Sequence, residues 1–185
     1  MSDVEAFKRV INYDNMDSSE LETLKKKLLL RQKTFQLKTL AQGNFLKFVK
    51  QVWPEFVEGP HHIQIAEKFQ ALAEGKINRL IVNMPPRHTK SEFASFLFPA
   101  WMMGRDPRLK IIQTTHTAEL SYRFGRKVRN LMEENAFQDV FDDIKLSQDS
   151  KAAGRWETNK GGEYFAAGVG GAITGRGADL LIIDD

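Results

Sequence analysis

Residues 79–92, with the sequence RLIVNMPPRHTKSE, contain the pattern on which the fold prediction depends. The apolar run 79–84 is typical of a buried strand, two prolines interrupt it, and the amphipathic segment 91–104 predicts a helix. A strand, a turn and a helix in this order form a phosphate-binding loop when the backbone N–H groups of the turn and the helix N-terminus face the phosphates. Such a loop carries a lysine for the outer phosphates and a Ser or Thr hydroxyl for Mg²⁺, and Lys90 and Ser91 stand at those positions.

The loop departs from the standard spelling G-x-x-x-x-G-K-[ST] at both glycine positions, which Met84 and Thr89 occupy. Glycine is favoured there because it reaches positive φ and lets the backbone approach oxygen atoms. Thr89 would be strained if the same geometry were needed. On these residues alone, a plain proline turn followed by a lysine is the alternative to a phosphate loop.

The segments on both sides of the loop predict an α/β fold. Strand and helix patterns alternate after Gly75, which predicts a parallel sheet covered by helices with right-handed crossovers, and the chain before Gly75 is helical. The expected helices are residues 17–42, 44 to the stop at Pro54, 60–75, 91–104 and 117–135. The expected strands are residues 79–84, 109–115, a hairpin pair around Trp156 and 164–167, and 180–183.

The last residues, LLIIDD, place two acids directly after a buried strand. A nucleotide hydrolase of this type needs an Asp at the carboxyl end of a strand for the Mg²⁺ shell and often a following acid that polarises the attacking water. Asp184 is the candidate for the metal role and Asp185 for the base role. Ligands of open α/β sheets bind beyond the carboxyl ends of the strands, where both motifs are expected. Together the two motifs predict a P-loop ATPase.

Composition limits the other possibilities. The 185 residues suffice for one folded domain, and the absence of cysteine excludes disulfides and thiolate metal sites, so that a metal is expected on oxygen ligands. No signal peptide or membrane-spanning run is seen, which predicts a cytoplasmic protein with no membrane partner. The net charge of +3 permits a polyanion partner, with basic side chains gathered in residues 123–129; a solvated helix face is the alternative there.

Three stretches carry a specific resemblance to a known family. They are PHHIQIAEKFQALAEGKINRLIVNMPPRHTKSE (60–92), FPAWMMGRDPRLKIIQTTHTAELSYRF (98–124) and GGEYFAAGVGGAITGRGADLLIIDD (161–185). In this combination the chain resembles the N-terminal ATPase region of the large terminase subunit of tailed bacteriophages. The resemblance implies a P-loop core of the RecA-like (ASCE) class that hydrolyses ATP with Mg²⁺ and drives double-stranded DNA into the procapsid through the portal.

The resemblance also assigns roles within the loop. The family's loop typically reads P-P-R-x-G-K-S, so Lys90 and Ser91 take the phosphate and Mg²⁺ roles, and Arg87 is implied to contact the γ-phosphate in cis. Thr89 stands where the family has glycine, which leaves affinity and turnover open. The nucleotide is expected on the whole loop, comprising Pro86, Arg87, His88, Thr89, Lys90 and Ser91.

Two further roles are implied outside the loop. Gln64 lies where the family has an adenine-contacting glutamine, with His62 as a weaker candidate; a polar residue on a surface helix is the alternative. Arg176 lies where a neighbouring subunit's nucleotide could be reached as an arginine finger, and a loop arginine paired with Asp179 is the alternative.

The resemblance further implies partners and an organisation. The expected partners are double-stranded DNA, the portal protein, the small terminase subunit and further copies of the chain in a ring on the portal, in the host cytoplasm. Residues 1–59 are expected to form a helical arm or lid and residues 60–185 an ATPase core that stops at its last strand, C-terminally truncated and without the nuclease domain. The alternatives are a non-catalytic nucleotide-binding or assembly fragment, in which this piece alone has no turnover, and another P-loop DNA translocase such as a helicase.

Overall fold

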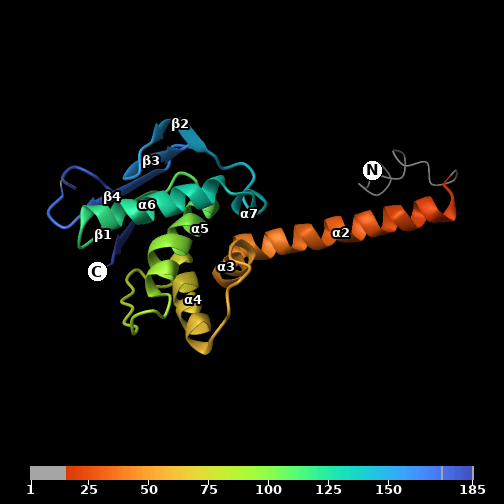
Figure 1. Ribbon diagram of the computed structural model, residues 1–185, viewed down its shortest axis with the longest axis horizontal. Helices are drawn as coiled ribbons and strands as arrows, with labels where there is room; N and C mark the ends of the chain where they lie inside the picture. Colours follow the sequence, from red (N-terminus) through yellow and green to blue (C-terminus); the bar gives the residue numbers. More distant parts are fainter. Residues whose placement is uncertain (1–15, 172, 185) are drawn as a thin grey trace. The chain divides into compact units, whose positions relative to one another are not determined.

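The computed structural model describes residues 16–171 and 173–184 (Figure 1). The chain divides into two compact units, Met1–Lys38 and Thr39–Asp185. The predicted boundary between residues 59 and 60 lies inside the second of these units, and the expected division into an arm and an ATPase core stays a prediction. No helix among the described residues has the length and apolar character needed to cross a membrane.

Helix α2, Ser18–Gly43, accounts for the described part of the first unit and continues into the second. The Asp17 carboxylate accepts hydrogen bonds from the backbone N–H groups of Ser19 and Glu20, and the Glu20 carboxylate accepts one from the backbone of Asp17. This reciprocal arrangement satisfies N–H groups that a helix N-terminus leaves without partners. It confirms the predicted start of the helix.

A five-stranded sheet forms the centre of the second unit, in the order β2-β3-β4-β1-β5. Its strands are β1 (Lys110–Thr115), β2 (Leu146–Lys151), β3 (Arg155–Thr158), β4 (Glu163–Gly168) and β5 (Leu180–Ile183). The central strand β1 is parallel to both β4 and β5, whereas β3 is antiparallel to β4 and β2 to β3. The predicted parallel sheet is thus confirmed for three strands, and the predicted hairpin around Trp156 is confirmed as β3 and β4.

Helices cover this sheet, with α6 lying along β1 and β4 (Figure 1). They are α3 (Phe45–Val52), α4 (Pro60–Ala73), the π-helix η2 (Glu92–Leu97), α5 (Phe98–Arg105), α6 (Ala118–Glu133) and the short α7 (Asn135–Gln138). Local signals set their ends. The Thr117 hydroxyl accepts a hydrogen bond from Leu120 N at the start of α6, and Gly75, with a φ of 69°, ends α4 in a left-handed turn.

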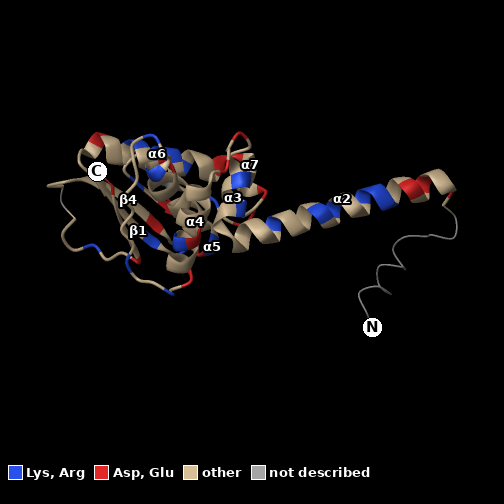
Figure 2. Cartoon of the chain, turned by 90° about the horizontal axis from the view of Figure 1, so that it is seen from below, with Lys and Arg blue, Asp and Glu red and all other residues tan. Residues whose placement is uncertain are grey.

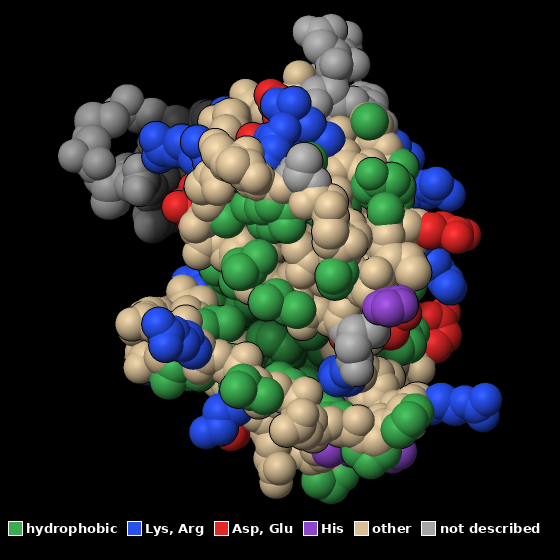
Figure 3. All heavy atoms as spheres, turned by 90° about the vertical axis from the view of Figure 1, so that its left-hand side faces the viewer, with side chains coloured by type: hydrophobic (Ala, Val, Ile, Leu, Met, Phe, Trp, Pro, Cys, Tyr) green, Lys and Arg blue, Asp and Glu red, His purple; other side chains and the backbone are tan. Residues whose placement is uncertain are grey.

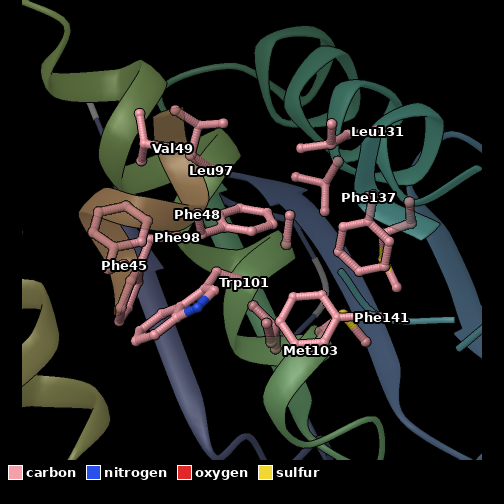
Figure 4. Close-up of a cluster of buried hydrophobic side chains, with 14 of the residues drawn as sticks. Phe45, Phe48, Val49, Leu97, Phe98, Trp101, Met103, Leu131, Phe137 and Phe141 are labelled. Carbon is pink, nitrogen blue, oxygen red and sulfur yellow. The ribbon is translucent and has the colours of Figure 1, made fainter. Parts of the chain in front are cut away.

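Aromatic side chains dominate the core of the second unit (Figure 4). Phe45 of α3 is fully buried and lies edge-on to Phe93 and Phe98, with ring centroids 5.6 and 5.5 Å away. Trp101 packs against the same ring and donates its indole N–H to the carbonyl oxygen of Ala41 at 3.0 Å. Edge-to-face aromatic packing adds to the free energy gained by burial. Helix α3 is therefore part of this core.

The predicted strand at residues 79–84 does not form. The structure assigns no strand to this segment, and Ile81 is 87% exposed. Strand β5 pairs only with β1 among the described strands. A pocket of about 130 Å³ is lined by β5, Leu80 and Val82, together with Lys90 and Asp184. Figure 3 shows a hollow lined by hydrophobic side chains on this face. A strand requires a neighbouring strand about 4.8 Å away to pair its backbone N–H and C=O groups. The prediction of a strand at residues 79–84 was wrong because no described strand pairs with this segment.

Candidate functional site

The loop between residue 84 and η2 has a backbone that disfavours ordinary side chains. Arg87 and Thr89 have φ angles of 64° and 63°, and these are the only positive values among the described residues other than glycine. In this left-handed region a Cβ atom crowds the following carbonyl oxygen. The glycine of the standard spelling predicts strain at Thr89 if the same geometry is needed there, and Thr89 has that geometry.

The loop leads directly into the turn of helix that carries Lys90 and Ser91. The carbonyl oxygen of Thr89 accepts a hydrogen bond from Phe93 N at 2.9 Å, which joins the loop to the helical backbone. Backbone N–H groups at such a start lack partners within the helix and attract anions. The loop therefore has the position and polarity that a phosphate group requires.

Lys90 meets Asp184, which lies far away in the sequence. The Lys90 Nζ atom is 3.6 Å from Asp184 Oδ1, and the carboxylate is only 6% exposed. Asp184 directly follows β5, and its backbone N–H donates to the carbonyl oxygen of Thr114 at 2.9 Å. The loop and the end of β5 thus come together at the carboxyl edge of the parallel strands, as the two motifs predicted.

Ser95 is a residue of this site that no sequence pattern predicted. Its fully buried hydroxyl donates a hydrogen bond to Asp184 Oδ2 at 2.8 Å, so each carboxylate oxygen has a different neighbour. Ser95 lies in the middle of η2, and π-helical turns are rare and frequent at functional sites. A serine within an apolar helical run gives no sequence signal of this contact, because only the fold brings it to Asp184.

A magnesium ion fits the donor types at this edge. Mg²⁺ is held by oxygen ligands, usually one or two carboxylates completed by substrate phosphates and water. The Asp184 carboxylate and the Ser91 hydroxyl are oxygens of this kind, and their metal roles stay a prediction. No group of three or more His, Asp or Glu suited to a metal ion occurs in the described part of the chain, so a bound phosphate would have to complete the coordination shell.

Two adjoining pockets flank the loop and share Met84 and Pro85. The first, of about 430 Å³, is lined by residues of the loop itself, including Arg87, Thr89, Lys90 and Ser91. The second, of about 500 Å³, lies between α4 and residues 80–85 and is lined by the exposed Gln64 together with His61 and His88. The predicted base-contacting residue and the predicted phosphate-contacting residues therefore line neighbouring pockets.

His62 is buried under the loop, and its Nε2 atom is 2.8 Å from the hydroxyl of Thr89. Burial lowers the pKa of His62 below its ordinary value, and the neighbouring His61 and His88 lower it further, against a raising effect of Glu58. The ring is therefore neutral at neutral pH. The ring contacts the hydroxyl of Thr89 in the loop and does not line the pocket that contains Gln64.

Arg176 lies at the opposite edge of the sheet. Its Nη1 atom donates to Glu163 Oε1 at 2.6 Å, and its guanidinium carbon is 4.1 Å from the ring centroid of Phe165. Glu163 begins β4 in register with Lys110, the first residue of β1, so this is the amino end of the parallel strands. The structure does not bring Arg176 to Lys90 of the same chain. Its partner is not Asp179, the expected alternative, which instead accepts the backbone N–H of Lys110.

Helix α6 carries several Lys and Arg residues (Figure 2). Arg123 and Arg126 are exposed, whereas Lys127 and Arg129 are half-buried. Lys127 Nζ donates to both carboxylate oxygens of Glu92 at 2.7 Å and lies 4.6 Å from the ring centroid of Phe96. Lys127 therefore ties α6 to the first turn after the loop. Asp185, the predicted base, lies outside the described residues.

The chain is similar to the large terminase subunit of Enterobacteria phage T3, with 25% identity over 148 residues. The match includes 78% of this chain and 25% of that protein, so the chain spans about a quarter of the relative's length. Neither a family model nor a solved structure matches the chain. At this identity and coverage, the chemistry has to be argued from the site.

Proposed function

We propose that this chain contains the ATP-binding and ATP-hydrolysing region of a large-terminase type of DNA-packaging protein, with a P-loop core of the RecA-like class. The observation that carries the proposal is the meeting of Lys90 and Asp184 beside a loop whose backbone has the left-handed turns of a phosphate-binding loop. The similarity to a phage large terminase subunit supports the same conclusion independently.

The proposed chemistry divides between the loop and the end of β5. Lys90 supplies positive charge to the outer phosphates, and the N–H groups at the start of the helix surround them. Asp184 and Ser91 would hold Mg²⁺, which would supply positive charge to the bound phosphates. Ser95 fixes the Asp184 carboxylate by donating a hydrogen bond from its hydroxyl to Oδ2. The nucleotide base occupies the pocket lined by Gln64.

Three residues complete the proposal from the family resemblance. Arg87 lines the loop pocket and contacts the γ-phosphate in cis, and Asp185 orients the attacking water. Arg176 acts on the nucleotide of a neighbouring copy, for which its ion pair with Glu163 must open. The proposed partners are double-stranded DNA, the portal protein, the small terminase subunit and further copies of the chain.

A comparison of ATP turnover in the wild-type chain and three variants tests the proposal. Lys90→Ala is expected to lower the rate at least about 100-fold, because an oriented positive charge is lost from the transition state. Lys90→Arg keeps the charge and tests geometry, and Lys76→Ala removes an exposed lysine paired with Glu74 as a matched control. Equal turnover in the wild type and Lys90→Ala would overturn the proposal.

Nucleotide binding without turnover is a second candidate function. The segment 79–84 favours this candidate, because it leads into the loop without forming a strand. The loop is therefore not anchored to the sheet by backbone hydrogen bonds of this segment. Equilibrium binding of Mg²⁺–ATP that depends on Lys90, with no phosphate release by the wild-type chain in the presence of double-stranded DNA, would support this candidate over the first.

A further inference from the structure

Thr89 adopts a backbone conformation that its side chain opposes. Its φ of 63° lies in the left-handed region, where residues other than glycine are strained and persist only when the surrounding structure holds them. Something outside the loop backbone must therefore fix this residue. The contacts of its hydroxyl group show what does so.

A directed chain of hydrogen bonds runs from α4 to the loop through His62. The backbone N–H of Gly59 donates to His62 Nδ1 at 2.9 Å, so the proton of the neutral ring is on Nε2. That N–H faces the Thr89 hydroxyl oxygen at 2.8 Å, and the Thr89 hydroxyl in turn donates to the carbonyl oxygen of His88. Every donor in the chain meets an acceptor.

The imidazole ring is itself held firmly. His62 is 6% exposed and lies in the first turn of α4, whose start Pro60 defines. Its ring stacks on Phe93 with a centroid distance of 5.4 Å and meets Phe56 edge-on at 4.8 Å. The nitrogen that faces Thr89 is therefore fixed by packing on the core and by the contact with Gly59.

We propose that His62 is a positioning residue that holds Thr89 in its left-handed conformation, so that the pair of side chains replaces the glycine of the standard loop. A glycine reaches this φ without a Cβ penalty. A threonine reaches it here because His62 binds its hydroxyl from a different element. The consequence for nucleotide binding rests on the proposed function, whereas the consequence for the loop itself does not.

A double-mutant cycle in the free energy of unfolding tests the pair. His62→Asn keeps an acceptor near Nδ1 for Gly59 and removes the donor toward Thr89, whereas His62→Gln keeps a donor near Nε2. Each is combined with Thr89→Gly, which removes the hydroxyl and the strain. Loss of ring packing is common to both backgrounds and cancels in the cycle.

The expected result is a coupling specific to the donor. His62→Asn should raise the unfolding equilibrium constant about fivefold more in the Thr89 chain than in the Thr89→Gly chain. This difference corresponds to the loss of one hydrogen bond. His62→Gln should give a ratio near one, and Thr89→Ser, which keeps the hydroxyl, should retain the coupling. Equal effects of His62→Asn in the Thr89 and Thr89→Gly chains would overturn the proposal.

Binding of a fluorescent ATP analogue with Mg²⁺ provides a second readout that a merely structural contact would not move. His62→Asn should weaken binding in the Thr89 chain and leave it within about twofold in the Thr89→Gly chain. Coupling in stability without coupling in binding would overturn the role in nucleotide binding. If no variant and no wild-type chain binds the analogue, the proposed function fails, and the unfolding cycle still decides whether His62 holds Thr89.

Discussion

Ion pairs lie at both ends of the parallel strands, and they differ in kind between the two ends. At the amino end, Glu163 receives Arg176 at 2.6 Å and Arg155 at 3.0 Å, and its side chain is 24% exposed. At the carboxyl end, Asp184 is nearly buried and Lys90 stays 3.6 Å away. Both arginines contact the same carboxylate oxygen, Glu163 Oε1, and all three side chains are partly exposed, which suits a structural contact at the surface. At the carboxyl end, Ser95 donates to one oxygen of the buried Asp184 carboxylate and Lys90 lies near the other, beside the loop.

Asp184→Asn should produce the largest effect. The amide keeps an acceptor for Ser95 but removes the charge beside Lys90, so ATP turnover is expected to fall about 100-fold or more and to require more Mg²⁺. A coupled ATPase assay with a Mg²⁺ titration measures both. Glu163→Gln is the matched control at the other end of the strands, and it should leave turnover within about threefold. A similar loss of ATP turnover in Asp184→Asn and Glu163→Gln would contradict a functional difference between the two ends of the parallel strands.

Ser95→Ala should come next, with a loss of stability larger than any expected at the amino end. It leaves the buried Asp184 Oδ2 without its hydrogen-bond donor, at a cost of about 1–3 kcal/mol in the free energy of unfolding. Urea denaturation measures this cost. Thr34→Ala removes an exposed hydroxyl that donates to Leu30 O on α2 and serves as the control, with an expected change within about 0.5 kcal/mol. Equal stability of the wild type and Ser95→Ala would contradict a supporting role for Ser95.

The sequence predicted the carboxyl end of the sheet better than its surroundings, for physical reasons. An apolar run followed by Asp184 and a lysine before a helix are local patterns, and the parallel arrangement of β1 and β5 brings them to one edge. The run 79–84 carries an equally apolar pattern and forms no strand, because hydrophobicity does not show whether a pairing partner is within reach. Periodicity predicts burial, and pairing depends on the rest of the fold.

The contacts that support Asp184 and Thr89 could not be predicted from the sequence, for a related reason. Ser95 and His62 act on Asp184 and Thr89 from other helices, and each contact depends on tertiary packing. The unusual φ of Thr89 could be anticipated, because the standard spelling has glycine at that position. The role of His62 in stabilising this φ could not be anticipated, because His62 lies at the start of α4 and is distant from Thr89 in the sequence.

Arg176→Ala sharpens the comparison at the amino end. Because both side chains are partly exposed and Arg155 still pairs with Glu163, the free energy of unfolding should change by less than about 1 kcal/mol. Chemical denaturation at low and high salt measures this change, and Arg155→Ala is the matched variant. A large loss of ATP turnover with unchanged stability, seen only in the assembled protein, would show that Arg176 acts on a neighbouring copy as proposed.

The pH dependence of stability gives the smallest effect and reports on the loop support. The folded-state pKa of His62 lies below its ordinary value of 6.5, so between these two values the unfolded chain binds a proton that the folded chain does not. Stability should therefore be complete above about pH 6.5 and fall as the pH is lowered through this window. Protonation also removes the acceptor for the Gly59 N–H and turns the ring into a cation beside His61 and His88, whereas the Glu58 carboxylate raises the pKa of the ring. Urea denaturation between pH 5 and 8, with His62→Gln as the non-titrating control, should show a shallower slope in the variant; an unchanged slope would assign the dependence to other groups.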